Sequence, residues 1–345
     1  MPRLPNRMAN KVQISNLKVQ SNFMQRCIQL ARNGLLNAAP NPMVGAVIVC
    51  DGRIIGEGYH ARCGEGHAEV NAIASVRPED LPLLPKSTIY VSLEPCAHYG
   101  KTPPCAQLII DKGIRHCVVG CVDPFAKVHG KGIQMLRDAG VEVTVGVMED
   151  ECKALNKRFM TFHQLHRPFI TLKWAQTADG FIGRHGQTPE HPLIISNTLT
   201  RVVCHRRRAE HQAILVGRHT LETDNPSLTV RDWDGPDPTP VVLGNIKKLK
   251  NTNLQLLNPD RGTLFFNSPE EAVNGLYERN IQSLLVEGGA KVLQSFIDLG
   301  LWDEAYVETG TQTISDGIPA PTLKNAARIA TRHYGQNTIT SYRHC

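Results

Sequence analysis

The chain of 345 residues is longer than one hydrophobic core usually supports, so we expect two domains. Hydrophobic residues make up 41% and charged residues 20%, which is typical of a globular protein and excludes a disordered chain. The net charge of +6 suits an anionic substrate as well as nucleic acid, but an aromatic content of 6% disfavours a surface on which bases stack.

The sequence shows no candidate membrane span and no secretory signal. Its longest apolar run, residues 44–50, is too short to cross a bilayer, and residues 1–13 are polar. Ten cysteines in a chain of this length do not indicate a small disulfide scaffold. We therefore expect a cytoplasmic protein in which most cysteines are buried thiols and a minority are metal ligands.

Helices and strands alternate through the first 148 residues, which predicts a mixed sheet with helices on both faces. Residues 44–49 and 53–59 are expected to pair as a hairpin around an Asp51-Gly52 turn. The predicted elements in chain order are helix 23–32, the two hairpin strands, helix 67–75, strand 88–93, helix 105–112, strand 118–121, helix 131–139 and strand 141–147.

A polar segment, residues 149–166, is expected to form a linking helix without a site motif, and a second α/β domain follows over residues 167–345. The tail after Gly310 is short and polar for a complete last pair of strands. The elements predicted in this domain are strand 169–174, helix 197–210, strands 213–216, 239–243 and 263–266, helix 269–279, strand 283–286, helix 291–299 and strand 305–308.

Three residues of the first domain have the side chains that a catalytic zinc requires. His67, Cys96 and Cys105 supply one imidazole and two thiolates, which leaves the fourth coordination position open for water. Glu69, two residues after the histidine, can receive the proton of that water, whose pKa zinc lowers to about 7. Each predicted ligand is also expected near the start of a helix, where the helix dipole favours a thiolate. The pattern predicts a zinc-dependent deaminase.

Two other interpretations stay open at this point. Eight residues separate Cys96 from Cys105, whereas the usual deaminase signature has two, and His98 or Cys63 is available as a fourth ligand of a closed structural zinc. Such a protein would be a zinc-stabilised binding protein in which Glu69 has no role. The other alternative is a deaminase of nucleic acids or nucleosides, which would need a basic, aromatic groove.

Several motifs of the first domain resemble one known family. They are Asn41-Pro-x-Val-Gly45, Gly58-Tyr-His60, His67-Ala-Glu-Val70, Leu93-Glu-Pro-Cys96, His98-Tyr-Gly-Lys-Thr-Pro-Pro-Cys105, Asp123-Pro124 and Gly130-Lys-Gly132. Their order resembles the deaminase half of the bifunctional deaminase/reductases of riboflavin biosynthesis. The resemblance implies a cytidine-deaminase-like fold and a diaminopyrimidinone substrate that carries ribose 5-phosphate.

The same resemblance implies that Asn41 and His60 line the pyrimidine pocket and that the loops of Asp123 and Lys131 lie near the ribose phosphate. Independently of the family, predicted loops near strand ends carry positive charge that suits a phosphate or a solvated surface equally well. The residues concerned are Lys101, Lys127, His129 and Lys131.

The second domain resembles the reductase half of the same family, which implies a dihydrofolate-reductase-like fold and NADPH as cofactor. The resemblance implies that the cofactor-binding residues are Lys173, Thr177, Asp179, Thr220, Asp224, Gly288 and Gly289, and that the substrate-binding residues are Arg208, Leu228, Arg231 and Glu287. The residues themselves add that Gly288-Gly289 ends a predicted strand and opens a helix, where backbone amides can hold a phosphate. Arg208 and Arg231 are also candidates to bind the substrate phosphate, because a guanidinium fork matches the geometry of a phosphate.

Residues 191–196 depart from the family pattern, because aliphatic side chains stand where a polar and aromatic pair is expected near the nicotinamide. An alternative is therefore a deaminase with a degenerate reductase domain. Aliphatic groups also provide the dry contact that hydride transfer requires, and we expect an active reductase. The resulting expectation is a homo-oligomeric enzyme that uses Zn²⁺ and NADPH on a phosphorylated pyrimidine and binds neither nucleic acid nor membranes.

Overall fold

The computed structural model describes residues 7–99, 103–125, 128–188, 191–251 and 253–345, with side chains from residue 18 onward. The chain divides into two compact units, Met1–Gln164 and Leu165–Cys345, and each is described by itself. Within the described residues, no helix is both long enough and apolar enough to span a bilayer.

The first unit is built on a five-stranded sheet with the strand order β2-β1-β3-β4-β5. The pairs β1–β2 and β1–β3 are antiparallel, whereas β3, β4 and β5 run parallel. The α-helices and strands of this unit up to its last strand are α1 (Arg7–Ala31), β1 (Gly45–Cys50), β2 (Arg53–Tyr59), α2 (Ala68–Ala74), β3 (Thr88–Leu93), α3 (Cys105–Asp111), β4 (His116–Cys121), α4 (Lys131–Asp138) and β5 (Glu142–Val145).

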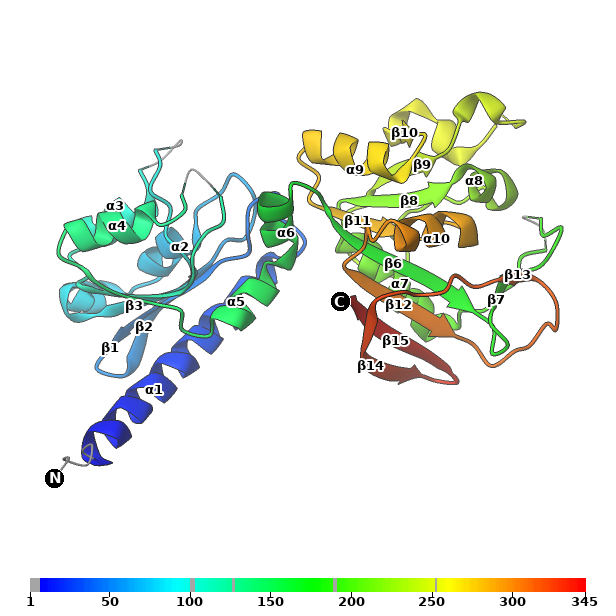
Figure 1. The fold of residues 1–345 in the computed structure, drawn as a ribbon. Coiled ribbons are helices and arrows are strands. Elements are labelled where there is room, and N and C mark those ends of the chain that lie inside the picture. Colours follow the sequence, from blue (N-terminus) through cyan, green and yellow to red (C-terminus); the bar gives the residue numbers. More distant parts are fainter. Residues whose placement is uncertain (1–6, 100–102, 126–127, 189–190, 252) are drawn as a thin grey trace. The chain divides into compact units, whose positions relative to one another are not determined.

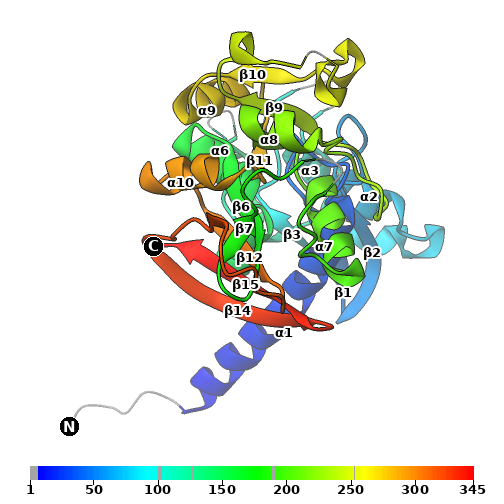
Figure 2. The same cartoon turned by 90° about the vertical axis from the view of Figure 1, so that its right-hand side faces the viewer.

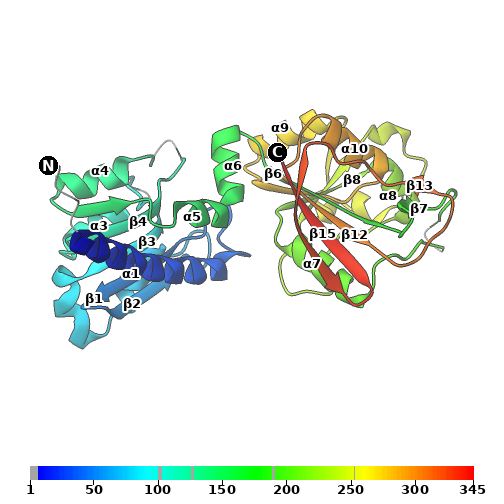
Figure 3. The same cartoon turned by 60° about the horizontal axis from the view of Figure 1, so that its bottom comes forward.

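Helices cover both faces of this sheet, which confirms the expected mixed architecture. Successive residues of β1 point to opposite faces, so that Ile48 packs with α2, α3 and α4 while Val47 packs with α1. Figure 1 shows α3 and α4 on one side of the strands, and Figure 3 shows α1 crossing the other side. The predicted hairpin turn is also present, because Asp51 and Gly52 both have positive φ, 50° and 75°.

The segment predicted as one polar linking helix is instead two helices, α5 (Glu149–Leu155) and α6 (Lys157–Leu165). They are separated by Asn156, whose buried side chain bonds both the N–H and the carbonyl of Met43 at 2.8 Å. Cys152 and Phe159 are buried in the core beside α1. The expectation was wrong because these apolar residues are scattered among charged ones, and because the partner of Asn156 is distant in sequence.

The second unit holds an eight-stranded sheet in the order β10-β9-β8-β11-β6-β12-β15-β14. The strands from β10 to β12 are parallel, and β15 and β14 continue the sheet antiparallel. The elements up to the last crossover are β6 (Phe169–Gln176), β7 (Phe181–Gly183), α7 (Thr198–Ala209), β8 (Ala213–Gly217), α8 (Arg218–Asp224), β9 (Thr239–Leu243), β10 (Leu264–Phe266), α9 (Pro269–Glu278), β11 (Ser283–Val286), α10 (Ala290–Asp298) and β12 (Glu304–Thr309).

This sheet also has a core on each face. One core joins α9 and α10 to residues such as Leu215 and Leu284, and the other joins α8 to Ile214 and Leu285. Figure 2 shows α10 on one side of the strands and α7 and α8 on the other. The α/β class predicted for this domain is thereby confirmed. The helix α8 and the short pair of β7 with β13 (Ile318–Pro319) were not predicted.

The expectation of an incomplete C-terminal edge was wrong. Strands β14 (Ala326–Tyr334) and β15 (Asn337–His344) form a full hairpin that extends the sheet from β12. Most of their side chains are partly or fully exposed, and Asn337 and Ile339 are the buried ones in β15. The polar composition therefore reflects a solvated edge of the sheet and not a missing strand.

Candidate functional site

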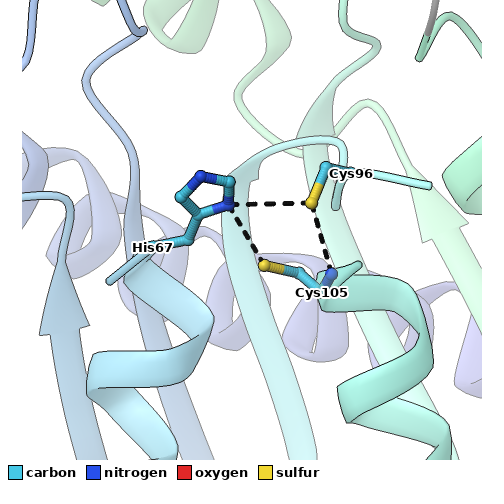
Figure 4. Close-up of side chains that lie close together, drawn as sticks. All are labelled: His67, Cys96 and Cys105. Carbon is cyan, nitrogen blue, oxygen red and sulfur yellow. Dashed lines mark hydrogen bonds between the residues drawn. The ribbon is translucent and has the colours of Figure 1, made fainter. Parts of the chain in front are cut away.

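Three side chains in the first unit form a group with the composition of a metal site. The ligand atoms of His67, Cys96 and Cys105 all lie within 4.8 Å of one another (Figure 4). His67 Nδ1 is 3.6 Å from Cys96 Sγ and 3.3 Å from Cys105 Sγ. The structure thus brings together the three residues that the sequence predicts as zinc ligands.

Two helix starts and one strand end deliver these ligands. His67 is the residue before α2, and Cys105 is the first residue of α3. Cys96 differs from the expectation, because it lies in the loop after β3 and not at a helix start of its own. Its sulfur nevertheless accepts the Cys105 backbone N–H at 3.2 Å, so the N-terminus of α3 stabilises this thiolate as well. Hydrogen bonds from Cys105 and His67 lower the pKa of Cys96 to about 4.

Glu69 lies in the first turn of α2, on the same helix that follows the ligand His67. Its side chain is buried, and burial together with the charge of Cys96 raises the pKa of Glu69 to about 7, while His67 acts in the opposite direction. A metal cation beside the carboxylate would lower that pKa. A carboxylate in this position is able to take up and release a proton near neutral pH.

Asn41 and His60 contact each other next to the ligand cluster. Asn41 Nδ2 is 3.1 Å from His60 Nε2, and His60 Nδ1 is 3.1 Å from the Gly66 carbonyl oxygen. Since a carbonyl only accepts, His60 carries its proton on Nδ1 and accepts from Asn41 on Nε2. Burial lowers the pKa of His60, and its ring meets that of His67 edge-on at 5.4 Å. The two predicted pyrimidine-pocket residues therefore form one neutral, fixed pair.

The predicted phosphate loop follows β4 and leads into α4. Asp123 is buried, and burial raises its pKa to about 6. Its side chain accepts the Phe125 N–H at 2.7 Å, and its backbone oxygen accepts from His129 Nδ1 at 3.1 Å. Lys131 is the exposed first residue of α4. Lys101 and Lys127 lie outside the described residues.

The second unit contains a polar cavity of about 410 Å³ between α7 and the end of β11. Three of the predicted substrate-binding residues line this cavity, namely the cations Arg208 and Arg231 and the anion Glu287. Arg201, His205 and Asp232 also line it, and the sequence analysis did not single them out. These residues had no local signal, because only the fold brings α7 and the loop before β9 together.

All three guanidinium nitrogens of Arg208 have protein partners, two of them on one carboxylate. Its Nε and Nη2 donate to Glu287 at 3.2 and 2.8 Å, and its Nη1 donates to the Thr229 carbonyl at 3.1 Å. Burial opposes the charge of Glu287, but Arg208 and Lys173 lower the pKa of that carboxyl to about 2. The fork that the sequence analysis assigned to a phosphate therefore holds Glu287. Arg231 is less constrained, since among the described residues its guanidinium donates to two hydroxyls, those of Ser227 and Thr229.

A second cavity of about 490 Å³ adjoins the first and shares Lys173 and Glu287 with it. Five of the seven predicted cofactor residues line this cavity: Lys173, Thr220, Asp224, Gly288 and Gly289. Gly288 permits a close approach of chains, because a Cβ there would lie 2.8 Å from the Gly217 nitrogen. Gly289 is the residue before α10 and donates its N–H to the Thr220 hydroxyl at 3.2 Å.

The other predicted residues of this domain lie elsewhere. Thr177 and Asp179 hydrogen-bond each other at 2.5 Å in the turn after β6, and Asp179 also accepts the N–H groups of Ile314 and Ser315. Leu228 is buried in the core that includes Leu221 and has a φ of 54°. Thr177, Asp179 and Leu228 do not line either cavity, and the contacts just described tie each of them to neighbouring parts of the fold.

The segment that departs from the family pattern forms part of the wall of the second cavity. Residues 192–195 line it together with Trp174 and Ile182. Ile194 is 72% exposed, so an apolar side chain is presented to the space beside Lys173. The departure therefore replaces an aromatic contact by an aliphatic one and leaves the cavity open.

Comparison with known proteins assigns both units to described families. Residues 17–121 match the cytidine and deoxycytidylate deaminase zinc-binding region, and residues 168–309 match the RibD C-terminal domain. Riboflavin biosynthesis protein RibD of Aquifex aeolicus is 36% identical over 330 residues, which cover 87% of this chain and 89% of the relative. This chain belongs to the RibD family. The RibD of Bacillus amyloliquefaciens is also 36% identical, over 87% of this chain and 86% of that protein.

Solved structures of RibD proteins agree with this chain over nearly its whole length. The diaminohydroxyphosphoribosylaminopyrimidine deaminase/5-amino-6-(5-phosphoribosylamino)uracil reductase of Thermotoga maritima is 34% identical, with a TM-score of 0.86 over 96% of this chain and all of that one. Acinetobacter baumannii RibD is 30% identical, with a TM-score of 0.85 over 95% of this chain and 99% of that one. Both halves of a bifunctional RibD are thus present, and the alternative readings as a scaffold or a nucleic-acid deaminase are not favoured.

Proposed function

We propose that this RibD-family chain deaminates a diaminopyrimidinone that carries ribose 5-phosphate and then reduces the ribosyl side chain of the product to ribityl. The protein is a hydrolase and an oxidoreductase of riboflavin biosynthesis, and zinc and NADPH are its cofactors. The observation that carries the first reaction is the group of His67, Cys96 and Cys105 beside the buried carboxylate of Glu69.

The residues of the first unit fit zinc. One imidazole and two sulfurs within 4.8 Å of one another are a donor set that zinc prefers, and three protein ligands leave a position for water. Zinc bound there supplies an acidified water, which is the chemistry that hydrolytic loss of an amino group requires. In our proposal Glu69 accepts the proton of that water and returns it to the departing ammonia.

The remaining residues of this site orient the pyrimidine. His60 donates its Nδ1 proton to the Gly66 carbonyl and accepts from the Asn41 amide on Nε2. This pairing fixes the orientation in which Asn41 faces the pyrimidine in our proposal. We assign Asn41 and His60 to the pyrimidine, and Asp123 and Lys131 to the ribose phosphate. The buried Asp123 carboxylate suits hydroxyl groups of the ribose, and the exposed Lys131 ammonium suits the phosphate.

The residues of the second unit fit a dinucleotide next to an anionic substrate. Gly288 and Gly289 line the second cavity at the start of α10, where a helix N-terminus suits a phosphate, and Lys173 lines both cavities. NADPH supplies the hydride, and the apolar residues 192–195 provide the aliphatic contact beside it. We assign the polar cavity to the ribosyl phosphate, with Arg231 as its phosphate contact and Arg208 as the support of Glu287.

A small pyrimidine is the substrate of the protein. We also propose that the protein is a cytoplasmic homo-oligomer that binds neither nucleic acid nor membranes. The thiolate ligands Cys96 and Cys105 favour the reducing cytoplasm, because oxidation would remove them from the metal site.

The test is to supply the aminopyrimidine phosphate with and without NADPH and to identify each product by mass spectrometry. We expect ammonia and the deaminated pyrimidine without NADPH, and the ribityl product only with NADPH. Deamination followed by no oxidation of NADPH would identify a degenerate reductase domain. Failure to release ammonia by zinc-loaded protein would overturn the proposal for the first unit.

A further inference from the structure

Glu94 is a buried carboxylate to which the reaction as described assigns no role. It follows β3 directly, stands two residues before the ligand Cys96, and is 4% exposed. Its own N–H donates to the Cys121 carbonyl at 3.0 Å, which ties it to the end of β4. It therefore lies between the metal ligands and the segment that leads from β4 to α4.

Backbone N–H groups from that segment surround the Glu94 carboxylate. Oε2 accepts from Asp123 at 3.2 Å and from Gly130 at 2.9 Å. Oε1 accepts from Gly132 at 2.9 Å and from Ile133 at 3.3 Å. A carboxylate with four such donors is held in one orientation, and it in turn holds Asp123 at the end of β4 together with residues 130–133 at the start of α4.

The start of α4 is built for this carboxylate. The residue before the helix, Gly130, has a φ of 77° and provides no side-chain cap, so the amides of Gly132 and Ile133 in the first turn of α4 take their acceptor from Glu94. Gly132 has to be glycine, because a Cβ there would lie 1.9 Å from the Pro95 carbonyl oxygen. The strand end that carries Glu94 and Cys96 is thus packed directly against the helix start.

The residues that we assign to the ribose phosphate, Asp123 and Lys131, lie inside the segment that Glu94 holds. The amide of Asp123 is itself one of the donors, and the amide of Lys131 closes the preceding turn on Val128. The side chain of His129 returns to the Asp123 carbonyl. A displacement of the Glu94 carboxylate would therefore move both substrate contacts relative to the metal ligands.

We propose that Glu94 is a positioning residue of the deaminase, which fixes Asp123 and the start of α4 relative to the ligand Cys96. The inference rests on the proposed deaminase function and adds the residue that sets the distance between the pyrimidine and phosphate ends of its site. Glu94 acts through the backbone and does not touch the reacting atoms.

The experiment compares E94Q with the control E142Q in the full-length, zinc-loaded enzyme. Glutamine keeps one acceptor oxygen but turns an NH₂ group toward two backbone donors, whereas Glu142 is an exposed residue of β5 with no role in the site. In E94Q we expect the KM for the aminopyrimidine phosphate to rise about tenfold or more, the scale of a lost hydrogen bond to a charged group, with a smaller change in kcat. We expect the zinc content and the reductase activity to stay unchanged, and E142Q to match the wild type.

Hydrogen exchange measures the same contact without relying on activity. The amides of Asp123, Gly130, Gly132 and Ile133 should be protected in the wild type and exchange faster in E94Q. Faster exchange with an unchanged KM would overturn the proposal, and so would a loss of zinc that accounts for the loss of activity. If E94Q does not fold, wild-type protection decides: amides that exchange as fast as those of the exposed residues 62–65 would overturn the proposal. Protected amides in a wild type that releases no ammonia would instead mark a failure of the proposed function.

Discussion

The candidate sites of the two units handle charge in opposite ways. In the first unit, the ligand atoms of His67, Cys96 and Cys105 lie together in a group that contains no cationic side chain, so this group suits a metal cation. In the second unit, Arg208 and Glu287 already satisfy each other in a buried ion pair, with side chains 12% and 10% exposed. The metal group of the first unit can be inferred from the types and spacing of its ligands in the sequence. In the second unit, the ion pair occupies groups that the sequence alone would assign to a ligand.

The strongest test of this contrast is removal of the metal. Because the ligand group in the first unit needs a cation and the second unit does not, a strong chelator should abolish ammonia release and leave the reduction of the deaminated product intact. Added zinc should restore ammonia release, with about one zinc per chain by elemental analysis. Deamination by protein shown to be free of metal would refute the assignment of His67, Cys96 and Cys105.

Replacing Glu69 separates proton transfer from metal binding. E69Q keeps the size and hydrogen bonding of the side chain but accepts no proton, so deamination should fall on the order of a hundredfold or more. Zinc content and NADPH oxidation should match the wild type, and E79Q, at an exposed position, serves as the control. Loss of zinc in E69Q would show that Glu69 supports the metal site and does not move protons.

In the second unit, R208A and R231A should have different effects. R208A leaves the buried Glu287 carboxylate without its main partner, so it should lower the free energy of unfolding by about 3–5 kcal/mol and reduce reductase activity on every substrate. R231A should preserve stability and weaken binding of the phosphorylated substrate by about 1.5–3 kcal/mol, with little effect on the dephosphorylated one. The measurements are urea unfolding and kcat/KM for both substrates.

R206A is the matched control for both arginine variants, because Arg206 is an exposed residue of the same helix paired with Glu210. Its stability and activity should stay close to those of the wild type. If R208A and R231A lose the preference for the phosphorylated over the dephosphorylated substrate to the same extent, Arg208 binds the phosphate, as its sequence motif implies.

The Arg208–Glu287 pair also predicts a dependence of stability on pH. The pKa of Glu287 falls from its ordinary 4.5 to about 2 in the folded protein, so its contribution to stability is present above about pH 4.5. That contribution is lost as the pH falls from about 4.5 to 2. The difference in unfolding free energy between the wild type and E287Q should therefore shrink across this range, and a constant difference would contradict the ion pair.

The smallest effect is expected for Asp179, whose carboxylate bonds the amides of Ile314 and Ser315. D179A should increase the hydrogen exchange of these amides and leave the KM for NADPH unchanged, because Asp179 does not line the second cavity. A selective rise in that KM, with unchanged exchange, would make Asp179 a cofactor contact as its motif implies. D298N, at an exposed position paired with Lys324, provides the comparison for a surface carboxylate.

Much of the first unit follows from local sequence signals. The pattern of apolar residues and the turn residues predicted β2 and β3 with the bounds that the structure shows. The residue types and spacing of the zinc motif identified three side chains that the fold brings together. These predictions succeed because each depends on neighbours within a few residues or on chemistry that few residue types provide. The same signals give the α/β class of both domains and the family resemblance.

Only the tertiary structure decided which charged groups are already paired. Arg208 has the chemistry of a phosphate contact in the sequence, but Glu287, 79 residues away, takes its guanidinium. Glu94 likewise has no local partner, and its four donors come from residues 29 to 39 positions later. The polar C-terminal tail becomes a sheet edge only because β12 offers it a free side. Sequence fixes the donors and acceptors along the chain, whereas burial and long-range packing determine which of them meet and which remain for a ligand.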